Sequence, residues 1–589
     1  MRKFPQVSVH LGKVAVLLAA CIATASCAPS VSVDSTGTAG TGAASASGGT
    51  SGAAGVAGAS SSGAAGAAGA VTGVAGGSGG TTGGAGSVGG GSGGAAGTIA
   101  GGGRGGASGA GTGGGRGGAT AGSGGASGTS GSAGASGTIT LTGLTIEANP
   151  NMTISCFASW TTATAATSEV DFGEGSYQFR IRDAAMVTAH RVLVIGMHAE
   201  KAYKIKAIST NAQGTGSVEG TFTTGKLPAS VPLPTLSASD FANSQVGWTL
   251  TNVMPAKSGP ANAVMYDQNG VPVWYYIHGT NADARGDVST DLIGNTVIVG
   301  PTSGEPARDV DLSGKVIWTG PAQTNAKLAT HFVGKTSTGN YLLNVELDKT
   351  ITSGSTKIDD QLLEEITPTG SVVWMWKLFD HITPAGTREE LCHGNSLTID
   401  EAAGVFYYNC RFVGMFKVDR ASGNVLWRMG GSYDTTSLGA GDFTYDPTAG
   451  RFSDAHDPEI HSDGTILFFD NGGYSGSFSG GGANYHSRVL EYQIDEAKKT
   501  AKVVWEFPGT FAVDAWYKNT WYSPYWGDAD RLGNGNILIT APTKSASAST
   551  RIFEVTRAGK VVWEITFPVN NGSFRAQRLA PPPLVEPLP

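Results

Sequence analysis

The sequence predicts an all-β protein: a six-bladed β-propeller preceded by a small β-sandwich and a long disordered tether. Three observations lead to this prediction. Gly, Ala, Ser and Thr make up nearly all of residues 28–137. Residues 138–226 contain short runs of alternating apolar and polar residues, and residues 238–580 contain six similar segments that each end in a tryptophan. The apolar runs are short, β-branched and interrupted by glycine, which argues against a helical fold.

Residues 1–27 have the features of a secretory signal of the bacterial lipoprotein type. A basic start, MRKFPQVSVHLGK, is followed by the apolar run VAVLLAACIA and by small residues. This run is too short to span a bilayer as a helix. Two cysteines are alternatives for lipidation: Cys21 ends LAAC, which has the better lipobox letters, and Cys27 ends TASC, which leaves a fuller apolar core. We therefore expect export to the periplasm or cell surface, with membrane contact only through a lipid anchor. An ordinary secretory peptide is the alternative.

Residues 28–137 are expected to form a flexible tether. They hold no aromatic residue and only three charged ones, Asp34, Arg104 and Arg116. Such a segment cannot bury enough apolar surface to offset the entropy lost on ordering. A Gly-rich coil of this length has a mean reach of about 55–60 Å, which suits a domain held away from a membrane surface.

Residues 138–226 favour a small β-sandwich, because short alternating runs are separated by turn residues. The order of SWTT, HRVLVIGMHAEKAYKIKAIST and TFTT resembles a fibronectin type III domain. We expect no catalysis in this domain. The Pro-rich segment KLPASVPLPTLS then joins the sandwich to the next domain.

The repeat in residues 238–580 decides the fold of the largest domain. Its six tryptophans are separated by 44, 56, 53, 78 and 58 residues. They end the segments DQNGVPVW, DLSGKVIW, TPTGSVVW, RASGNVLW, EAKKTAKVVW and TRAGKVVW, at Trp274, Trp318, Trp374, Trp427, Trp505 and Trp563. Six units of this length favour six propeller blades with the tryptophans packed between them. Quinone-dependent dehydrogenases have similar tryptophan motifs, but their propellers usually have eight blades.

The charge and the cysteines narrow the function classes. A net charge of −7 without any basic block gives no reason to expect a nucleic acid partner. Cys392 and Cys410 lie on two apolar stretches joined by EAAG. A hairpin with its turn near Ala402 would place them opposite each other, and export would allow a disulfide. Two free buried thiols are the alternative; with the bridge formed, Cys156 is unpaired.

Three histidines occupy corresponding positions in successive units. His331 and His456 each lie eight residues before the glycine of a strand-entering turn, and His393 lies eleven before Gly404. The three are spaced by 62 and 63 residues. Because equivalent positions of successive blades surround one axis, we expect these histidines to meet at the mouth of the central channel. A single buried histidine would more often be structural.

The other histidines lack this register. We expect His461 to be solvated and His381 to support a loop. Structural or surface roles are expected for His10, His190, His198, His278 and His486.

Two polar residues accompany the three histidines. Asn395 is two residues after His393, so both point the same way along a regular strand. Arg411 follows Cys410 and lies opposite His393 if the hairpin forms. The resulting set is rich in hydrogen-bond donors, and its one neighbouring carboxylate is Asp457.

This set favours an oxyanion over a metal ion. Three histidines can hold zinc or copper. The fixed positive charge of Arg411, however, repels a cation and suits two parallel hydrogen bonds to an oxyanion. The expected ligand is a sulfate or phosphate ester, and no metal is expected.

Several ordered motifs resemble the arylsulfotransferase family of bacterial arylsulfate sulfotransferases. They are WMWKLFDHITP, HGNSL, CRF, VDRASGNVLWRMGG, FSDAHDPEIHSDGTILFFDNGG and SRVLEYQIDEAKKTAKVVWEFPG. The resemblance covers most of residues 238–570. It implies a six-bladed propeller with an added β domain in the periplasm. It also implies transfer of a sulfuryl group from a phenolic sulfate ester to another phenol, without a nucleotide sulfate donor and without a cofactor.

The resemblance also assigns roles to residues. His456 matches the nucleophile, which would form a sulfohistidine. His331, His393, Asn395 and Arg411 match the residues that would donate to the sulfuryl oxygens or to the leaving phenolate.

Other assignments are less distinct. Thr543 and Lys544, in ITAPTKSAS, are candidates for polar residues from the last blade, although the Ser/Ala-rich loop here departs from the family pattern. Asp457 is a candidate for substrate binding. Either Asp457 or a backbone carbonyl is a candidate for fixing the tautomer of His456. Tyr474, Trp521 and Tyr525 are candidates for an aryl pocket, with ordinary packing as the alternative.

Two other function classes stay open at this point. One is a non-catalytic binding lipoprotein built on a propeller, and the other is a metal-dependent hydrolase or lyase. The sequence indicates no particular oligomeric state.

Overall fold

The computed structural model describes most of the chain after residue 136. The described ranges are 137–255, 259–279, 289–302, 305–322, 327–353, 356–383, 391–430, 441–472, 486–542 and 549–589. Their regular structure is almost entirely strand, so the all-β prediction is confirmed. The expected signal, both lipidation candidates and the tether lie outside these ranges, as do Tyr474, Thr543 and Lys544. Within the described ranges, no helix is long and apolar enough to cross a membrane.

The N-terminal sheet is built mainly from the first strands of the described chain. Its strands are β1 (Leu141–Ala148), β2 (Cys156–Glu174), β3 (Phe179–Val194), β4 (Ala202–Asn211), β5 (Gly214–Thr223) and the C-terminal β33 (Glu586–Pro587). The order is β33-β3-β2-β4-β5. The first half of the long strand β2 pairs with β1 and its second half pairs with β4. The sheet buries Trp160 and Phe172. Its likeness to a fibronectin type III domain stays a prediction.

Six further sheets follow in the described residues, and they are numbered from first to sixth in chain order. The first contains β32 (Ala576–Leu579), β7 (Trp248–Pro255), β8 (Ala261–Tyr266), β9 (Pro272–His278) and the short β31 (Asn571–Gly572). The second contains β10 (Thr290–Ile293), β11 (Thr296–Val299), β12 (Arg308–Asp311) and β13 (Val316–Thr319). The third contains β14 (Lys327–Lys335), β15 (Tyr341–Ser353), β16 (Thr356–Ile366) and β17 (Val372–Lys377).

The last three sheets have the same plan. The fourth contains β18 (Gly394–Asp400), β19 (Val405–Cys410), β20 (Gly414–Asp419) and β21 (Val425–Met429). The fifth contains β23 (His456–Ile460), β24 (Thr465–Asp470), β25 (Arg488–Asp495), β26 (Thr500–Phe507) and a parallel strand, β22 (Thr444–Asp446). The sixth contains β27 (Asp528–Arg531), β28 (Ile537–Ala541), β29 (Arg551–Val555), β30 (Val561–Thr566) and β6 (Thr235–Ser239).

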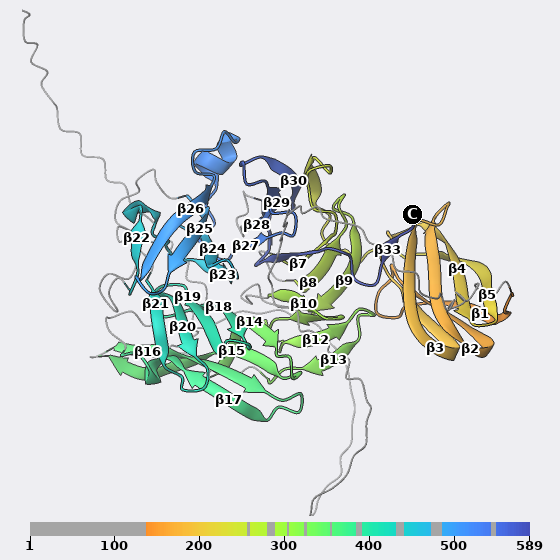
Figure 1. Cartoon of the computed structure of the whole chain (residues 1–589), viewed down its shortest axis with the longest axis horizontal. Coiled ribbons are helices and arrows are strands. Elements are labelled where there is room, and N and C mark those ends of the chain that lie inside the picture. The colour runs from red at the N-terminus through yellow and green to blue at the C-terminus, as the bar shows by residue number, and fades with distance from the viewer. Residues whose placement is uncertain are drawn as a thin grey trace, which may run out of the picture. The chain divides into compact units, whose positions relative to one another are not determined.

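The sheets follow one another around a ring, which is the arrangement of a β-propeller (Figure 1). Strands β14, β18, β23 and β27 contact one another in this order, and β28 contacts β32 of the first sheet. Strands β7 and β32 in turn contact β10 of the second sheet. The chain closes this ring at both ends, because β6 joins the sixth sheet and β32 joins the first.

Tryptophans of the repeated motif fasten neighbouring sheets together. The indole Nε1 of Trp274 donates to Leu312 O of the second sheet at 2.9 Å. Trp505 Nε1 donates to Arg557 O of the sixth sheet at 3.0 Å, and Trp563 Nε1 donates to Gln268 O of the first at 2.8 Å. These three tryptophans therefore pack between sheets, as the repeat predicted, and the indole N–H of each of the three finds an acceptor.

Candidate functional site

The structure brings His331, His393 and His456 together. His331 lies on β14, His393 directly precedes β18, and His456 opens β23, so they come from the first strands of three successive sheets. The Nε2 atoms of His331 and His393 are 3.1 Å apart. Phe574 packs against both His331 and His456, with ring centroids 5.6 and 6.1 Å away. All three imidazoles are buried.

The backbone is distorted where these side chains arise. His331 and His393 have positive φ angles of 55° and 52°, and Asp457 has one of 42°. Left-handed backbone at a non-glycine residue costs about 1–3 kcal/mol and clusters at functional sites. Strand register also shifts next to each histidine, between β14 and β15, β18 and β19, and β23 and β24. Such irregularities re-aim side chains, and here they turn residues of three strands toward one point.

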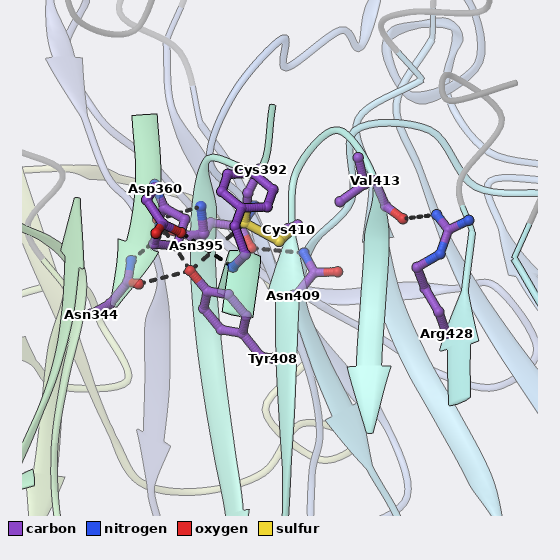
Figure 2. The surroundings of a disulfide bond; sticks show 12 residues. Asn344, Asp360, Cys392, Asn395, Tyr408, Asn409, Cys410, Val413 and Arg428 are labelled. Atoms are coloured by element: carbon purple, nitrogen blue, oxygen red, sulfur yellow. Dashed lines mark hydrogen bonds between the residues drawn. A yellow bond between two sulfur atoms is a disulfide. The ribbon is translucent and has the colours of Figure 1, made fainter. Parts of the chain in front are cut away.

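Arg411 is held against His393 by the backbone and by a disulfide. Its N–H donates to His393 O at 3.1 Å. Cys392 and Cys410, the residues directly before His393 and Arg411, are joined by a disulfide with Cα atoms 4.7 Å apart (Figure 2). This is the pairing expected from the hairpin. The Arg411 guanidinium is buried, donates from Nη2 to Pro524 O at 2.6 Å and lies over the ring of Phe412.

Gly394, between His393 and Asn395, lies over the hydroxyl of Tyr408. A Cβ at this position would be 1.7 Å from Tyr408 Oη. The hydroxyl donates to Asn344 Oδ1 at 2.9 Å, and Asn344 Nδ2 donates to Gly394 O at 2.7 Å. Figure 2 shows Tyr408 and Asn344 meeting next to the disulfide. The glycine is therefore required because a side chain of the adjacent strand fills the space below it.

His456 is held in one tautomer by its neighbours. Its Nδ1 lies 2.7 Å from Asn471 Oδ1 and 3.1 Å from Asp454 O. Because both neighbours accept, Nδ1 carries the proton and Nε2 carries the lone pair. The backbone N–H of Trp526 donates to Nε2 at 3.2 Å. Asn471 was missed by sequence reasoning, although it lies in the same FFDNGG stretch, because nothing in the sequence shows which amide faces the imidazole.

The pKa of His456 lies well below its ordinary value. Burial is the largest cause, since it disfavours the charged ring. The charge of Arg411 lowers the pKa further, as do His331 and His393, whereas the hydrogen bond with Asn471 acts in the opposite direction. His456 is therefore neutral at physiological pH.

Asn395 contacts the chain around His456. Its Nδ2 donates to Ala455 O at 3.0 Å, and its Oδ1 accepts from Asn409 Nδ2 at 2.7 Å. The register shift between Gly394 and Ser396 also breaks the regular alternation on which the sequence argument rested. At least one amide hydrogen of Asn395 thus holds the strand that carries His456.

The neighbourhood contains more charged groups than the sequence indicated. The carboxylate of Asp457 lies 3.4 Å from Arg575 Nε, and Arg575 Nη1 lies 3.2 Å from Asp291 Oδ2. Asp454 Oδ2 lies 3.8 Å from Arg411 Nη2. Of the two alternatives for fixing the tautomer of His456, the structure favours the backbone carbonyl over Asp457, because Asp454 O lies at Nδ1 together with Asn471 Oδ1.

Several other expectations can be compared with the structure. His461 is buried, so the expectation that it is solvated is wrong. His381 stacks on Trp376 at 5.3 Å between ring centroids. Trp521 is fully buried among Phe469, Phe507 and Phe553, so it has a packing role.

The fold and site together define a β-propeller whose inner strands gather imidazoles and one guanidinium. Residues 240–575 match the family model of the arylsulfotransferases (ASST). The chain belongs to this family, which implies a sulfotransferase that uses an aryl sulfate donor and a phenolic acceptor. No curated protein matches the chain.

Solved structures resemble the chain only distantly. BamB from Moraxella catarrhalis is 9% identical, with a TM-score of 0.26, covering 74% of this chain and 98% of that chain. The Swd1 β-propeller domain from Myceliophteria thermophila is 10% identical, with a TM-score of 0.30, covering 58% and 89%. A quinoprotein alcohol dehydrogenase-like protein from Bacteroides thetaiotaomicron is 10% identical, with a TM-score of 0.24, covering 73% and 95%.

Removing the disulfide should weaken both the fold and the site. In a Cys392→Ala/Cys410→Ala variant, the unfolded chain regains the freedom of a loop with a sequence separation of 18 residues. We expect a loss of about 3 kcal/mol in the free energy of unfolding. Thermal unfolding of the oxidised wild type and of the variant measures this difference. An unchanged midpoint would show that the bridge contributes nothing.

Gly394→Ala should be strongly destabilising, because its Cβ would overlap the Tyr408 hydroxyl. Overpacking of this kind costs about 1–3 kcal/mol. Gly533→Ala is a matched control, since its Cβ would meet nothing closer than the flexible Gln245 side chain at 3.2 Å. Denaturant midpoints should fall for the first variant only. Equal midpoints for the two variants would contradict the packing argument.

Proposed function

We propose that this protein transfers a sulfuryl group from an aryl sulfate to a phenol through a sulfohistidine at His456. No nucleotide sulfate donor and no cofactor takes part. One observation carries the proposal: His456 is buried and neutral, and its unprotonated Nε2 lies in a cluster with Arg411 and two more imidazoles. The protein scaffold would be a six-bladed propeller, with each of the six sheets as one blade.

The charges around His456 suit an anionic donor. Arg411 supplies a fixed positive charge, and a guanidinium can hold two oxygens of one sulfate at once. His331 and His393 share a short Nε2–Nε2 contact, so at least one of them carries a proton on Nε2. These groups can donate to the sulfuryl oxygens, where charge lies in the transition state by analogy with phosphoryl transfer.

The first half-reaction forms a nitrogen–sulfur bond and breaks a sulfur–oxygen bond. The lone pair of His456 Nε2 attacks sulfur, and the phenolate leaves with the electron pair of the broken bond. If one imidazole of the His331–His393 pair is protonated, it can then give this proton to the phenolate, and both imidazoles are left neutral. The imidazole of the sulfohistidine is positively charged, because Nδ1 keeps its proton; Asn471 Oδ1 and Asp454 O accept from it.

The second half-reaction reverses these events with another phenol. The acceptor oxygen attacks sulfur, its proton passes to the imidazole pair, and Nε2 recovers its lone pair. Splitting the transfer in this way is covalent catalysis, and it produces ping-pong kinetics. A phenol has a pKa of about 10, so its oxygen leaves more easily than an alkoxide, which favours aryl donors.

The Trp526 amide has to move for this chemistry. It donates to the same Nε2 lone pair that attacks sulfur, so this hydrogen bond must open as the donor enters. The N–H then lies next to the sulfuryl group and can donate to one of its oxygens. We expect the turn that carries Trp526 to shift when an aryl sulfate binds.

The location of the protein is part of the proposal. Residues 1–27 have the composition of a lipoprotein signal and residues 28–137 that of a tether. Residues 138–226 would form a fibronectin type III-like domain between the tether and the propeller. Export would also suit the Cys392–Cys410 disulfide, since disulfides persist in oxidising compartments.

Turnover of a chromogenic aryl sulfate tests the reaction class. We expect phenol release that requires a phenolic acceptor and is unaffected by a chelator, with parallel lines in double-reciprocal plots. His456→Ala should abolish it, whereas the exposed His486→Ala should not. Arg411→Lys should lower kcat by about 10²–10³-fold, the usual effect of losing an oxyanion donor.

The rival functions predict other results in the same assay. Loss of activity with chelator would indicate a metal-dependent hydrolase. Binding of aryl sulfates without turnover, by a folded wild-type protein, would indicate a non-catalytic propeller.

A further inference from the structure

Asn471 connects the proposed nucleophile to the turn formed by residues 521–527. It follows β24 and is fully buried. Its Nδ2 donates two hydrogen bonds of 2.7 Å, to Ser523 O and to Trp526 O. Its Oδ1 lies 2.7 Å from His456 Nδ1. Both amide hydrogens of Asn471 are therefore used in hydrogen bonds.

These contacts fix the orientation of the amide. Ser523 O and Trp526 O are carbonyl oxygens, so they accept and cannot donate. The NH₂ group of Asn471 must therefore face them, which leaves Oδ1 facing His456. An oxygen that only accepts requires a proton on Nδ1. The tautomer of His456 follows from this chain of donors and acceptors.

A neutral amide suits this position better than a carboxylate. The proposed sulfohistidine carries a positive imidazole, which an amide oxygen stabilises without adding a full negative charge. A carboxylate at the same place would raise the pKa of His456 and favour its protonated form, which cannot attack sulfur. The charged or titratable groups that lower the pKa of His456 are Arg411 after β19, His331 on β14 and His393 before β18. Asp454 and Asp457 lie beside His456 along the chain. Arg575 forms an ion pair with Asp457.

We propose that Asn471 is a positioning residue that holds His456 in the tautomer with Nδ1 protonated, and that it ties this imidazole to the turn carrying the Trp526 amide. The catalytic consequence rests on the proposed function. The assignment of the tautomer does not rest on the proposed function. The tautomer and the catalytic consequence can therefore be disproved separately. The turn contributes Ser523 O and Trp526 O to Asn471, and Trp526 N–H to Nε2. Any displacement of the turn therefore changes the hydrogen bonds at both ring nitrogens of His456.

Nitrogen NMR of protein labelled with ¹⁵N in its histidine rings tests the tautomer directly. The His456 signals are those lost in a His456→Gln variant. We expect a protonated Nδ1 and an unprotonated Nε2 in the wild type at neutral pH, and a mixture of tautomers in Asn471→Ala. A wild-type His456 with the proton on Nε2 would overturn the proposal, whether or not the protein transfers sulfate.

Asn536→Ala is a matched control for this experiment. Asn536 is buried and donates from Nδ2 to Asn243 O at 2.8 Å and to Glu554 Oε1 at 2.7 Å, but it has no contact with His456. Its loss should leave the His456 signals and kcat unchanged. A mixture of tautomers in Asn536→Ala equal to that in Asn471→Ala would show a general effect of cavity formation and would also overturn the proposal.

The pH profile of turnover tests the catalytic consequence. Asn471→Ala should lower kcat by roughly 10- to 100-fold, by analogy with the loss when the orienting partner of a metal-bound histidine is removed, with little change in KM. Asn471→Asp should move the acid limb of kcat/KM to higher pH, because an ionised carboxylate beside Nδ1 raises the pKa of His456. An acid limb that stays in place in a folded Asn471→Asp variant would contradict the proposed role.

Discussion

The hydrogen bond from His456 Nδ1 to Asn471 Oδ1 is the interaction on which the proposed chemistry of this site depends. It places the proton on one ring nitrogen and the lone pair on the other. Burial and the charge of Arg411 keep the ring neutral. A neutral imidazole with a defined lone pair is a nucleophile, whereas a protonated or inverted imidazole is a donor. The same buried residue would otherwise serve only to bind an anion.

The propeller supplies the surroundings of that imidazole. Its inner strands bring His331, His393 and His456 together from three sheets. Distorted backbone at these positions aims the side chains, and the disulfide next to His393 and Arg411 keeps the fourth sheet in place there. Tryptophans pack between the sheets, and strands β6 and β32 close the ring. The site is therefore built on a rigid support.

Much of this arrangement could be predicted because it repeats. The tryptophan spacing predicted the repeated sheets, and the common distance of His331 and His456 from their turns predicted that these side chains come together. The pairing of Cys392 with Cys410 could be predicted because it depends only on two adjacent strands and the turn between them. Arg411 followed from the same local pairing.

The remaining site residues depend on contacts between distant segments. Asn471 meets His456 only because the turn at residues 521–527 orients its amide. Arg575 meets Asp457 only because β32, which directly follows Arg575, pairs with β7. The register shift at Asn395 likewise depends on the adjacent strand, so a regular alternation does not reveal it. The burial of His461 is another effect of neighbouring sheets that one strand does not reveal.

Mass spectrometry of the protein mixed with an aryl sulfate, without acceptor, tests the central claim most directly. The sample is quenched at alkaline pH and digested. The account predicts the added mass of one SO₃ group per chain, on the peptide containing His456, and its loss when a phenol is added before quenching. Phenol release without any covalent adduct, or an adduct on another residue, would contradict it.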